Sequence, residues 1–253
     1  MAQNVLTLQS GRGQIAPLAN IGVMENALHR LKNRGPGDPG LFVVSGPSGY
    51  GKSFAAAHAK ALHQAYYVQL DDFVTKKSLL VTLCRTLGLC AYDKKPKGTT
   101  ADLAEMVGAQ LAASRRVLIL DEFDFAADKE LVMAVFSIYE KSKASILLIG
   151  EEAMPAKLAK WEKFDGRVLD TLYAEPVGLK DARTLAQHKY PEFSFADDLL
   201  AHLAEIAKGS VRRVNNNLAI IHNEALSMGW ERCDRALWGE RKLQHAEVKR
   251  RGA

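Results

Sequence analysis

Short apolar runs alternate with longer amphipathic stretches over residues 21–173 of this 253-residue chain. A short apolar run is typical of a buried strand, whereas apolar residues that recur every three or four positions are typical of a helix. The pattern predicts strands at 41–44, 65–70, 117–120, 145–150 and 171–173. It predicts helices at 21–31, 54–62, 78–87, 100–111 and 129–141, and Asp71 is expected to cap the helix at 78–87. We therefore expect an α/β fold, in which a parallel sheet is covered by helices on both faces.

The pattern changes near residue 178. Amphipathic stretches at 180–189, 196–208 and 211–228 predict three helices with no convincing strand, and a final helix is expected from about 235 to 249. Residues 1–20 show little periodicity and are interpreted as an irregular arm. The expected order is thus an arm (1–20), an α/β core (21–177) and a small all-helical domain (178–253) that ends on basic residues, Lys249-Arg250-Arg251.

The most specific motif lies between the first predicted strand and the next helix. Gly46-Pro47-Ser48-Gly49-Tyr50-Gly51-Lys52-Ser53 has the spacing G-x-x-x-x-G-K-[ST], which is a phosphate-binding loop when a strand precedes it and a helix follows it. Its glycines let successive backbone N–H groups turn toward an anion, and the helix N-terminus adds partial positive charge. The sequence therefore predicts that the chain binds a nucleoside triphosphate.

Individual residues of this motif have predictable roles. Lys52 can reach the β- and γ-phosphates, and the Ser53 hydroxyl can bind Mg²⁺. The residues expected to contact the nucleotide, ATP, are Gly46, Pro47, Ser48, Gly49, Tyr50, Gly51, Lys52, Ser53 and Phe54.

A second motif follows the strand predicted at 117–120. Asp121 and Glu122 come directly after four apolar residues, so they emerge at the carboxyl edge of the sheet, where open α/β folds bind ligands. We expect Asp121 to orient Mg²⁺ through its water shell and Glu122 to polarise the water that attacks the γ-phosphate. A solvated acidic turn is the alternative, but the complete phosphate loop upstream favours the catalytic interpretation. Glu151 and Glu152, after the strand at 145–150, are also expected near the γ-phosphate.

Composition adds few constraints. The chain has 34 Lys+Arg and 29 Asp+Glu, and its formal net charge of +5 permits nucleic-acid binding without requiring it. Cys84, Cys90 and Cys233 lack C-x-x-C spacing and are expected to be reduced and buried. No apolar segment is long enough to span a bilayer, and the N-terminus lacks a signal-peptide core, so a soluble intracellular protein is expected.

These features resemble the AAA+ ATPases, in which an ATP-binding α/β core precedes a helical lid. The resemblance rests on GPSGYGKS, on LILDE and on the lid segment Gly209-Ser210-Val211-Arg212-Arg213-Val214-Asn215-Asn216. It implies that Arg212, or alternatively Arg213, is the second sensor that contacts the γ-phosphate in its own subunit. The first sensor position falls on Gly150 or Glu151, neither of which is the family's usual Asn or Thr.

The same resemblance implies that Arg167 is the arginine finger that reaches the ATP of a neighbouring subunit. A surface salt bridge is the alternative role for this residue and for the lid arginines. Within the AAA+ proteins, the strand ILLIGEE and the lid motif are most similar to the transposition regulators of the phage Mu B and Tn7 C type. That similarity implies an ATPase of the bacterial or phage-infected cytoplasm that coats duplex DNA as rings or helical filaments and recruits a transposase. A helicase loader or replication initiator and a secretion-associated ATPase remain alternatives.

Family resemblance places DNA contacts on two loops. One is Thr75-Lys76-Lys77, and the other contains Lys94, Lys95, Lys97 and Thr99. Their lysines suit contacts with phosphates, which provide affinity without reading the base sequence. Aromatic residues do not interleave closely with these lysines, so duplex DNA is favoured over a single strand. Solvated lysines on ordinary loops are the alternative interpretation.

Overall fold

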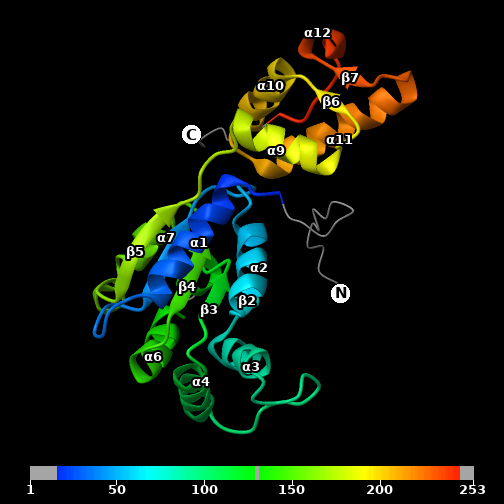
Figure 1. Ribbon diagram of the computed structural model, residues 1–253. Coiled ribbons are helices and arrows are strands. Elements are labelled where there is room, and N and C mark those ends of the chain that lie inside the picture. Colours follow the sequence, from blue (N-terminus) through cyan, green and yellow to red (C-terminus); the bar gives the residue numbers. More distant parts are fainter. Residues whose placement is uncertain (1–15, 129–130, 246–253) are drawn as a thin grey trace, which may run out of the picture. The chain divides into compact units, whose positions relative to one another are not determined.

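A computed structural model describes residues 16–128 and 131–245, and its contacts divide the chain into two compact units (Figure 1). We call residues 23–46 and 55–174 the α/β unit. The described residues of 1–22, 47–54 and 175–253 form the helical unit, to which the phosphate-binding loop belongs by its contacts.

The α/β unit contains a five-stranded parallel sheet with the order β2-β3-β4-β1-β5. Its strands are β1 (Leu41–Ser45), β2 (Tyr66–Gln69), β3 (Leu118–Asp121), β4 (Ile146–Gly150) and β5 (Val168–Tyr173). The five predicted strands are thus confirmed. Every residue of β1, β3 and β4 is buried, because a central parallel strand is covered on both faces and therefore has a continuously apolar sequence.

Helices flank this sheet (Figure 1). They are α1 (Ala19–Lys32), α2 (Lys52–His63), α3 (Lys76–Thr86), α4 (Thr100–Ser114), α5 (Asp124–Asp128), α6 (Val132–Ser142), α7 (Met154–Leu158) and α8 (Glu162–Asp165). The helix predicted at 129–141 is shorter, since α6 begins at Val132, and residues 129–130 lie outside the described part. The expected cap of the helix at 78–87 was also wrong. Thr75 caps α3 with a reciprocal Ser78 contact, while Asp71 accepts a hydrogen bond from the N–H of Phe73 in the preceding turn.

One apolar cluster joins the sheet to α3, α4 and α6 in the α/β unit. Phe123 and Phe164 are both fully buried in it, with ring centroids 6.4 Å apart. Phe123 follows the acidic pair at the end of β3, and Phe164 lies in α8 just before Arg167. Two segments that carry predicted catalytic residues are therefore anchored by aromatic side chains in the core.

The helical unit contains α9 (Leu179–Lys189), α10 (Asp197–Ala207), α11 (Val211–Met228) and the short α12 (Arg235–Trp238). This unit differs from the prediction in two respects. The unit is not all-helical, because β6 (Ser194–Phe195) pairs in parallel with β7 (Arg232–Cys233). The predicted helix from about 235 to 249 ends at Trp238, where Gly239 is the C-cap, and the basic residues 249–251 lie outside the described part.

The core of the helical unit extends to the start of the described chain. Ala16 and Leu18, which lie in the predicted irregular arm, are buried in the same apolar cluster as α9, α10 and α11. Helix α1 begins at Ala19, within that arm. Cys84 and Cys233 are buried, Cys90 is half-buried, and all three cysteines are free thiols. Among the described residues, no helix combines the length and apolar character required to cross a membrane.

Candidate functional site

The phosphate-binding loop follows β1 and ends in the first turn of α2. Gly49 has φ of +86°, and a Cβ atom at this position would lie 2.6 Å from Oγ of Ser210. Both the left-handed backbone and the close approach of Ser210 therefore require glycine at this position. Ser48 is exposed, whereas Pro47, Tyr50, Ser53 and Phe54 are half-buried.

Lys52 and Ser53 occupy the first turn of α2, at the positive end of the helix dipole. The Lys52 ammonium donates a hydrogen bond to the carbonyl of Pro47 at 2.9 Å. This contact folds the lysine side chain back over its own loop. The cation and the N-terminal N–H groups of α2 therefore lie together in one short segment, the arrangement that an anionic phosphate group requires.

The backbone N–H groups of the two lid arginines have different hydrogen-bond acceptors. The N–H of Arg212 donates to the carbonyl of Gly49 at 3.3 Å, and the Arg212 side chain is exposed. The N–H of Arg213 instead donates to Oγ of Ser210, which caps α11, and its side chain is half-buried. The start of α11 thus packs against the phosphate-binding loop through the backbone of Arg212.

Asn20 is a further contact of the loop that sequence reasoning missed. Its amide nitrogen donates to the carbonyls of Tyr50 and Glu175, both at 2.8 Å, and its amide oxygen accepts from the N–H of Glu175 at 2.7 Å. Asn20 is 6% exposed, so three hydrogen bonds are made with little competition from water. This side chain ties the loop to the segment that leads into α9. No local pattern marked it, because its partners lie 30 and 155 positions away.

Asp121 is the last residue of β3 and is only 1% exposed. One carboxylate oxygen, Oδ1, accepts from the N–H of Glu122 at 2.9 Å. The other, Oδ2, accepts from the hydroxyl of Tyr67 on the neighbouring strand β2 at 2.7 Å. Burial, reinforced by the charge of Asp121, raises the pKa of the Tyr67 phenol. Tyr67 therefore keeps its proton and acts as the donor in this pair.

Glu122 has a left-handed backbone with φ of +55°. This conformation costs a non-glycine residue about 1–3 kcal/mol and is concentrated at functional sites. The next residue holds it in place, since the N–H of Phe123 donates to the carbonyl of Ile149 at 2.8 Å and the Phe123 ring is fully buried. The chain therefore turns sharply after β3, and Glu122 leaves the strand as a half-buried side chain.

The predicted first sensor position has no room for a side chain at Gly150, the last residue of β4. A Cβ atom there would lie 2.3 Å from Sδ of Met154 and 2.4 Å from Oδ2 of Asp124. The same Asp124 oxygen accepts from the N–H of Glu151 at 2.6 Å. The carboxylate of Asp124, on α5, therefore occupies the space beside the end of β4. Glu151 and Glu152 have exposed side chains.

Arg167 lies at the opposite edge of the sheet from the residues that follow β1, β3 and β4. It immediately precedes β5, and its carbonyl accepts from the N–H of Leu41 at the amino end of β1. Because the strands are parallel, this position is remote from Gly46 and Asp121 at the carboxyl edge. Within the α/β unit, Arg167 is thus placed away from the carboxyl ends of the strands.

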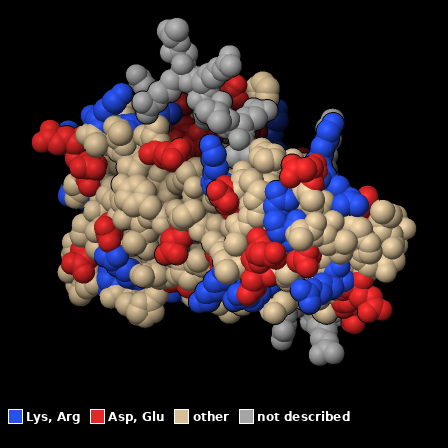
Figure 2. Space-filling model, turned by 90° about the horizontal axis from the view of Figure 1, so that it is seen from above, with Lys and Arg blue, Asp and Glu red and all other residues tan. Residues whose placement is uncertain are grey.

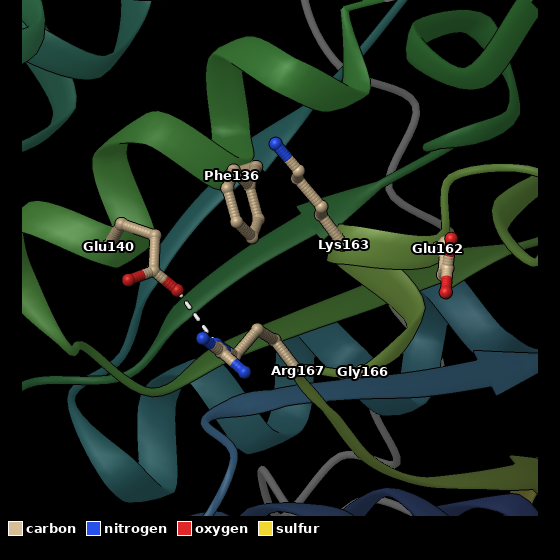
Figure 3. Close-up of a pocket in the computed structure, with 6 residues that line it drawn as sticks. All are labelled: Phe136, Glu140, Glu162, Lys163, Gly166 and Arg167. Atoms are coloured by element: carbon tan, nitrogen blue, oxygen red, sulfur yellow. Dashed lines mark hydrogen bonds and ion pairs between the residues drawn. The ribbon is translucent and has the colours of Figure 1, made fainter.

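The Arg167 side chain lines an open depression of about 590 Å³ (Figure 3). Its guanidinium pairs with Glu140 of α6 at 2.7 Å, and the Arg167 side chain as a whole is 46% exposed. Hydrogen bonding and charge from Glu140 raise the pKa of Arg167. Phe136 and Lys163 also line the depression, and the Lys163 side chain extends across it toward Phe136 (Figure 3). The surface salt bridge considered for Arg167 is therefore present.

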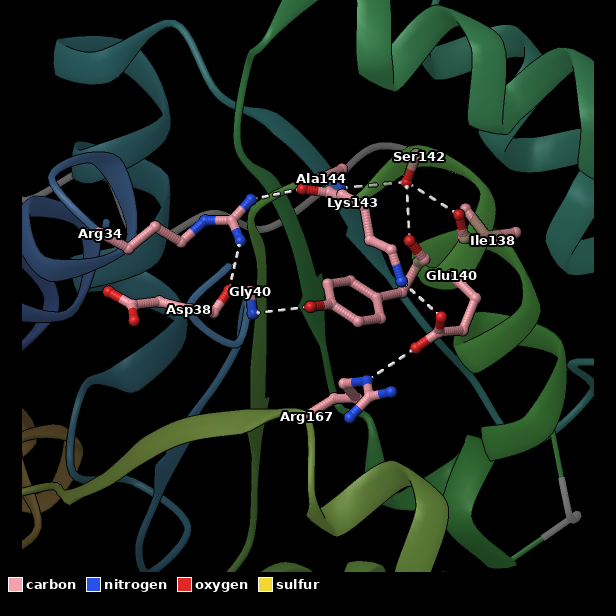
Figure 4. A network of polar contacts seen from close by, with 10 residues as sticks. Arg34, Asp38, Gly40, Ile138, Glu140, Ser142, Lys143, Ala144 and Arg167 are labelled. Atoms are coloured by element: carbon pink, nitrogen blue, oxygen red, sulfur yellow. Dashed lines mark hydrogen bonds and ion pairs between the residues drawn. The ribbon is translucent and has the colours of Figure 1, made fainter. Parts of the chain in front are cut away.

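A polar network holds the end of α6 beside Arg167 (Figure 4). Glu140 pairs with both Lys143 and Arg167, and the hydrogen bonds from these two side chains lower the pKa of the Glu140 carboxyl. The hydroxyl of Tyr139 accepts from the N–H of Gly40 at 3.1 Å. Arg34 donates to the backbone carbonyl of Lys143. These contacts connect α6 to the segment before β1, so Glu140 has a fixed position from which to orient Arg167.

The predicted DNA-binding lysines are exposed. Lys76 and Lys77 belong to the first turn of α3, which corrects the expectation that they lie in a loop. Lys94, Lys95 and Lys97 lie in the connection between α3 and α4. The Thr99 side chain caps α4 in a reciprocal contact with Asp102, so its hydroxyl already has a structural role.

The same two segments carry exposed aromatic residues that sequence reasoning discounted. Phe73, before α3, and Tyr92, after it, are each 86% exposed. The guanidinium of Arg85 lies 5.5 Å from the Tyr92 ring centroid. Exposed aromatic side chains are the groups on which the bases of a single strand stack, so these two residues make a single strand a possible ligand beside duplex DNA.

Charge by itself does not mark a nucleic-acid surface. On the face drawn in Figure 2, Lys and Arg side chains are interspersed with Asp and Glu. This mixture agrees with the modest net charge of +5. Any contact with DNA must therefore depend on the local position of particular lysines.

Comparison with protein families matches residues 34–158, just under half of the chain, to the AAA domain. A search of the curated proteins finds no match to this sequence. The matched residues include the phosphate-binding loop and the acidic pair after β3.

Solved structures show the same fold at low identity. Cdc6p from Pyrobaculum aerophilum is 15% identical, with a TM-score of 0.61, over 84% of this chain and 62% of that protein. The Aeropyrum pernix ORC1 protein in complex with DNA is 17% identical, with a TM-score of 0.58, over 87% and 62%. The Aeropyrum pernix ORC2 protein in ADPNP–ADP complexes is 17% identical, with a TM-score of 0.62, over 89% and 68%.

The α/β fold with its central parallel sheet is thus that of the P-loop AAA+ ATPase structures, as predicted. This chain spans about 62% of the length of the first two structures. At these identities, the comparison shows the fold alone.

Proposed function

We propose that this chain is an Mg²⁺-dependent ATPase of the AAA+ type. The observation that carries the proposal is the phosphate-binding loop, which has the left-handed Gly49 backbone and has Lys52 and Ser53 in the first turn of α2. The buried Asp121 carboxylate at the end of β3 supplies the acidic group that such a site also requires. The AAA domain match over residues 34–158 supports the same conclusion.

The loop and the end of β3 each have the residue types that bind a triphosphate and its Mg²⁺. Loop N–H groups and the Lys52 ammonium would bind phosphate oxygens, and Ser53 would provide a hydroxyl ligand for the cation. Asp121 would accept hydrogen bonds from the water shell of the cation. Bound Mg²⁺ would neutralise charge on the phosphates, and Glu122 would accept the proton of the attacking water as general base.

For the lid, the structure supports Arg212 over Arg213 as the second sensor. The Arg212 backbone contacts Gly49, whereas the N–H of Arg213 is used in the cap of α11. A guanidinium at the start of α11 would approach a γ-phosphate held by the loop. This contact would make the position of the lid depend on whether ATP or ADP is bound.

At a finer level, we propose that the ATPase assembles on duplex DNA into rings or filaments and delivers that DNA to a transposase. The exposed lysines at the start of α3 and between α3 and α4 support a phosphate-binding surface. The position of Arg167, at the sheet edge away from Gly46, supports a contact with the nucleotide of a neighbour. An intersubunit nucleotide would make assembly depend on the nucleotide state.

A second candidate is a replication initiator or helicase loader. The structural similarity to Cdc6p and to ORC1 in complex with DNA favours it. Purified protein that forms a defined complex with a replicative helicase, and none with a transposase, would select this candidate. Hydrolysis that does not respond to DNA would instead point to a secretion-associated ATPase.

The central test measures phosphate release and assembly together. We expect ATP hydrolysis to increase with duplex DNA, and electron microscopy with a slowly hydrolysed ATP analogue to show ordered assemblies on that DNA. Single particles on DNA with every nucleotide would contradict the assembly proposal. Addition of single-stranded DNA as a competitor tests whether Phe73 and Tyr92 change the preference for duplex DNA.

Lys52→Ala is expected to weaken ATP binding by about 100-fold. A charge-assisted hydrogen bond contributes about 1.5–3 kcal/mol, and about 2.8 kcal/mol corresponds to 100-fold in affinity. Titration with a fluorescent ATP analogue measures the effect. Lys160→Ala, which removes an exposed lysine between α7 and α8, is the control and should bind normally. Equal affinities for the Lys52 variant and the wild type would remove the loop from the proposed site.

Replacement of both Lys76 and Lys77 by alanine is expected to weaken the salt dependence of duplex DNA binding. The slope of log K against log salt concentration should become shallower by about two. Each neutralised phosphate contributes about 0.9 to this slope. The measurement is a salt titration of binding in the presence of the ATP analogue.

The control for that experiment is a double variant at Lys141 and Lys160, two exposed lysines outside the predicted DNA-binding segments. It changes the net charge by the same amount. If the salt dependence weakens equally in both double variants, the effect is one of general charge. If it does not weaken in the Lys76 and Lys77 variant, the DNA-binding surface lies elsewhere on the protein.

A further inference from the structure

Tyr67 makes a contact with the acidic pair that no sequence motif indicated. It lies in β2, one strand away from Asp121, and its register partner in β3 is Ile119. Two positions further along, Gln69 pairs with Asp121. The Tyr67 side chain therefore extends toward the carboxyl end of β3, where its hydroxyl lies 2.7 Å from Oδ2 of Asp121.

The contact leaves Asp121 with a defined orientation. The N–H of Glu122 holds Oδ1, and the hydroxyl of Tyr67 holds Oδ2. Because the carboxylate is 1% exposed, water competes poorly for either oxygen. A carboxylate oxygen can accept more than one hydrogen bond, so both oxygens keep the capacity to accept from a hydrated cation. The two donors set the plane of the carboxylate without blocking it.

We propose that Tyr67 is a positioning residue that sets the orientation of Asp121 for Mg²⁺-dependent nucleotide binding. This inference rests on the proposed function, since it concerns the same carboxylate. The role is indirect: Tyr67 acts on the site only through its hydrogen bond to Asp121. Loss of the Tyr67 hydroxyl would let the Asp121 carboxylate rotate about its side-chain torsions. The water shell of the cation would then donate to a carboxylate with a less defined orientation.

The neighbouring residue Tyr66 supplies a matched control. Successive strand residues point to opposite faces of the sheet, and the Tyr66 ring lies under Arg116, whose guanidinium carbon is 3.9 Å from the ring centroid. Tyr66 is buried like a core residue, so Tyr66→Phe tests the loss of a hydroxyl from β2 without a change at Asp121.

The experiment measures binding of a fluorescent ATP analogue as Mg²⁺ is increased, and again in EDTA. Residues that hydrogen-bond to the ligands of a metal ion typically change the affinity for that ion by about 10–100-fold. For Tyr67→Phe, we expect the Mg²⁺ concentration at half-maximal binding to rise by about tenfold. Affinity in EDTA should stay within about twofold of the wild type. Tyr66→Phe should match the wild type in both conditions.

A double-mutant cycle separates positioning from a general loss of structure. Asp121→Asn removes the charged acceptor, so adding Tyr67→Phe to it should raise the Mg²⁺ requirement no further. Independent, additive effects would overturn the inference. So would a wild-type Mg²⁺ requirement in Tyr67→Phe, or an equal loss of affinity with and without Mg²⁺. If the wild-type chain binds no nucleotide under any condition, the proposed function itself fails, and that outcome is distinct from the others.

Discussion

Glu122→Gln is expected to bind ATP with nearly wild-type affinity and to hydrolyse it about 10²–10⁴-fold more slowly. The amide keeps the size of the side chain and its place after β3, but it cannot accept the proton of the attacking water. A positioned general base typically contributes a factor of this size. DNA-bound assemblies should consequently last longer, because cleavage of the γ-phosphate would become the slow event. Single-turnover phosphate release and nucleotide titration measure the two effects separately.

Glu152→Gln is the comparison for this prediction, because Glu152 is also expected near the γ-phosphate but not as the general base. It makes the same chemical change in an exposed glutamate just beyond the end of the neighbouring strand β4. Hydrolysis in this variant should remain close to that of the wild type. Rapid turnover in Glu122→Gln, or an equal loss in the Glu152 variant, would show that the general base has been wrongly identified. The strained backbone at Glu122, with φ of +55°, gives a structural reason to favour it over Glu152.

Arg167→Ala is expected to lower the turnover of the assembled protein by about 10³-fold while leaving the nucleotide affinity of the monomer unchanged. Arginine fingers contribute about 10³–10⁵ to phosphoryl transfer. The residue lies at the amino edge of the sheet, so its own subunit's phosphate-binding loop does not depend on it. Assembly should also weaken. Hydrolysis as a function of protein concentration, together with light scattering, measures these effects.

Arg30→Ala is the control for Arg167. Arg30 forms a similarly exposed ion pair with Asp170 at 2.5 Å in the same α/β unit. An exposed ion pair usually contributes only about 0–1 kcal/mol to stability. If Arg167 has no role beyond its pair with Glu140, both variants should show small changes in stability and normal turnover. A large loss confined to Arg167→Ala would support the role in a neighbouring subunit.

Glu140→Gln extends the same comparison, because it removes the charge that orients Arg167 but leaves the guanidinium in place. Lys143 shares that carboxylate, so the variant also loosens the end of α6 (Figure 4). An arginine that has to leave Glu140 to reach a phosphate would be more available in this variant. If Glu140 orients Arg167, turnover in Glu140→Gln should fall, as it does in Arg167→Ala. If Glu140 instead competes with a phosphate for Arg167, turnover in Glu140→Gln should not fall.

Much of the fold was accessible from the sequence because the deciding interactions are local. Each predicted strand of the sheet was a short apolar run, and burial on both faces explains why β1, β3 and β4 have no polar alternation. The phosphate-binding loop was equally accessible, since its glycines and Lys52 lie within eight consecutive positions. Helix α11 begins and ends at the predicted residues, Val211 and Met228.

The errors in the fold came from signals that periodicity does not capture. The last predicted helix ran past Gly239, although that residue ends α12. The pairing of β6 with β7 involves two residues on each side, too few for any alternation to appear. The cap of α3 was assigned to Asp71, whereas Thr75 lies immediately before the helix and makes the reciprocal contact with Ser78.

The sequence by itself determined the α/β order, the phosphate-binding loop and the acidic pair after β3, because each depends on residues that are neighbours in the chain. Only the tertiary structure decided how those groups are held. The Tyr67 hydroxyl reaches Asp121 across 54 positions, Asn20 reaches Glu175 across 155, and Glu140 holds Arg167 across 27. Contacts of this kind arise from strand order and packing, which bring distant side chains together and leave no pattern in the local sequence.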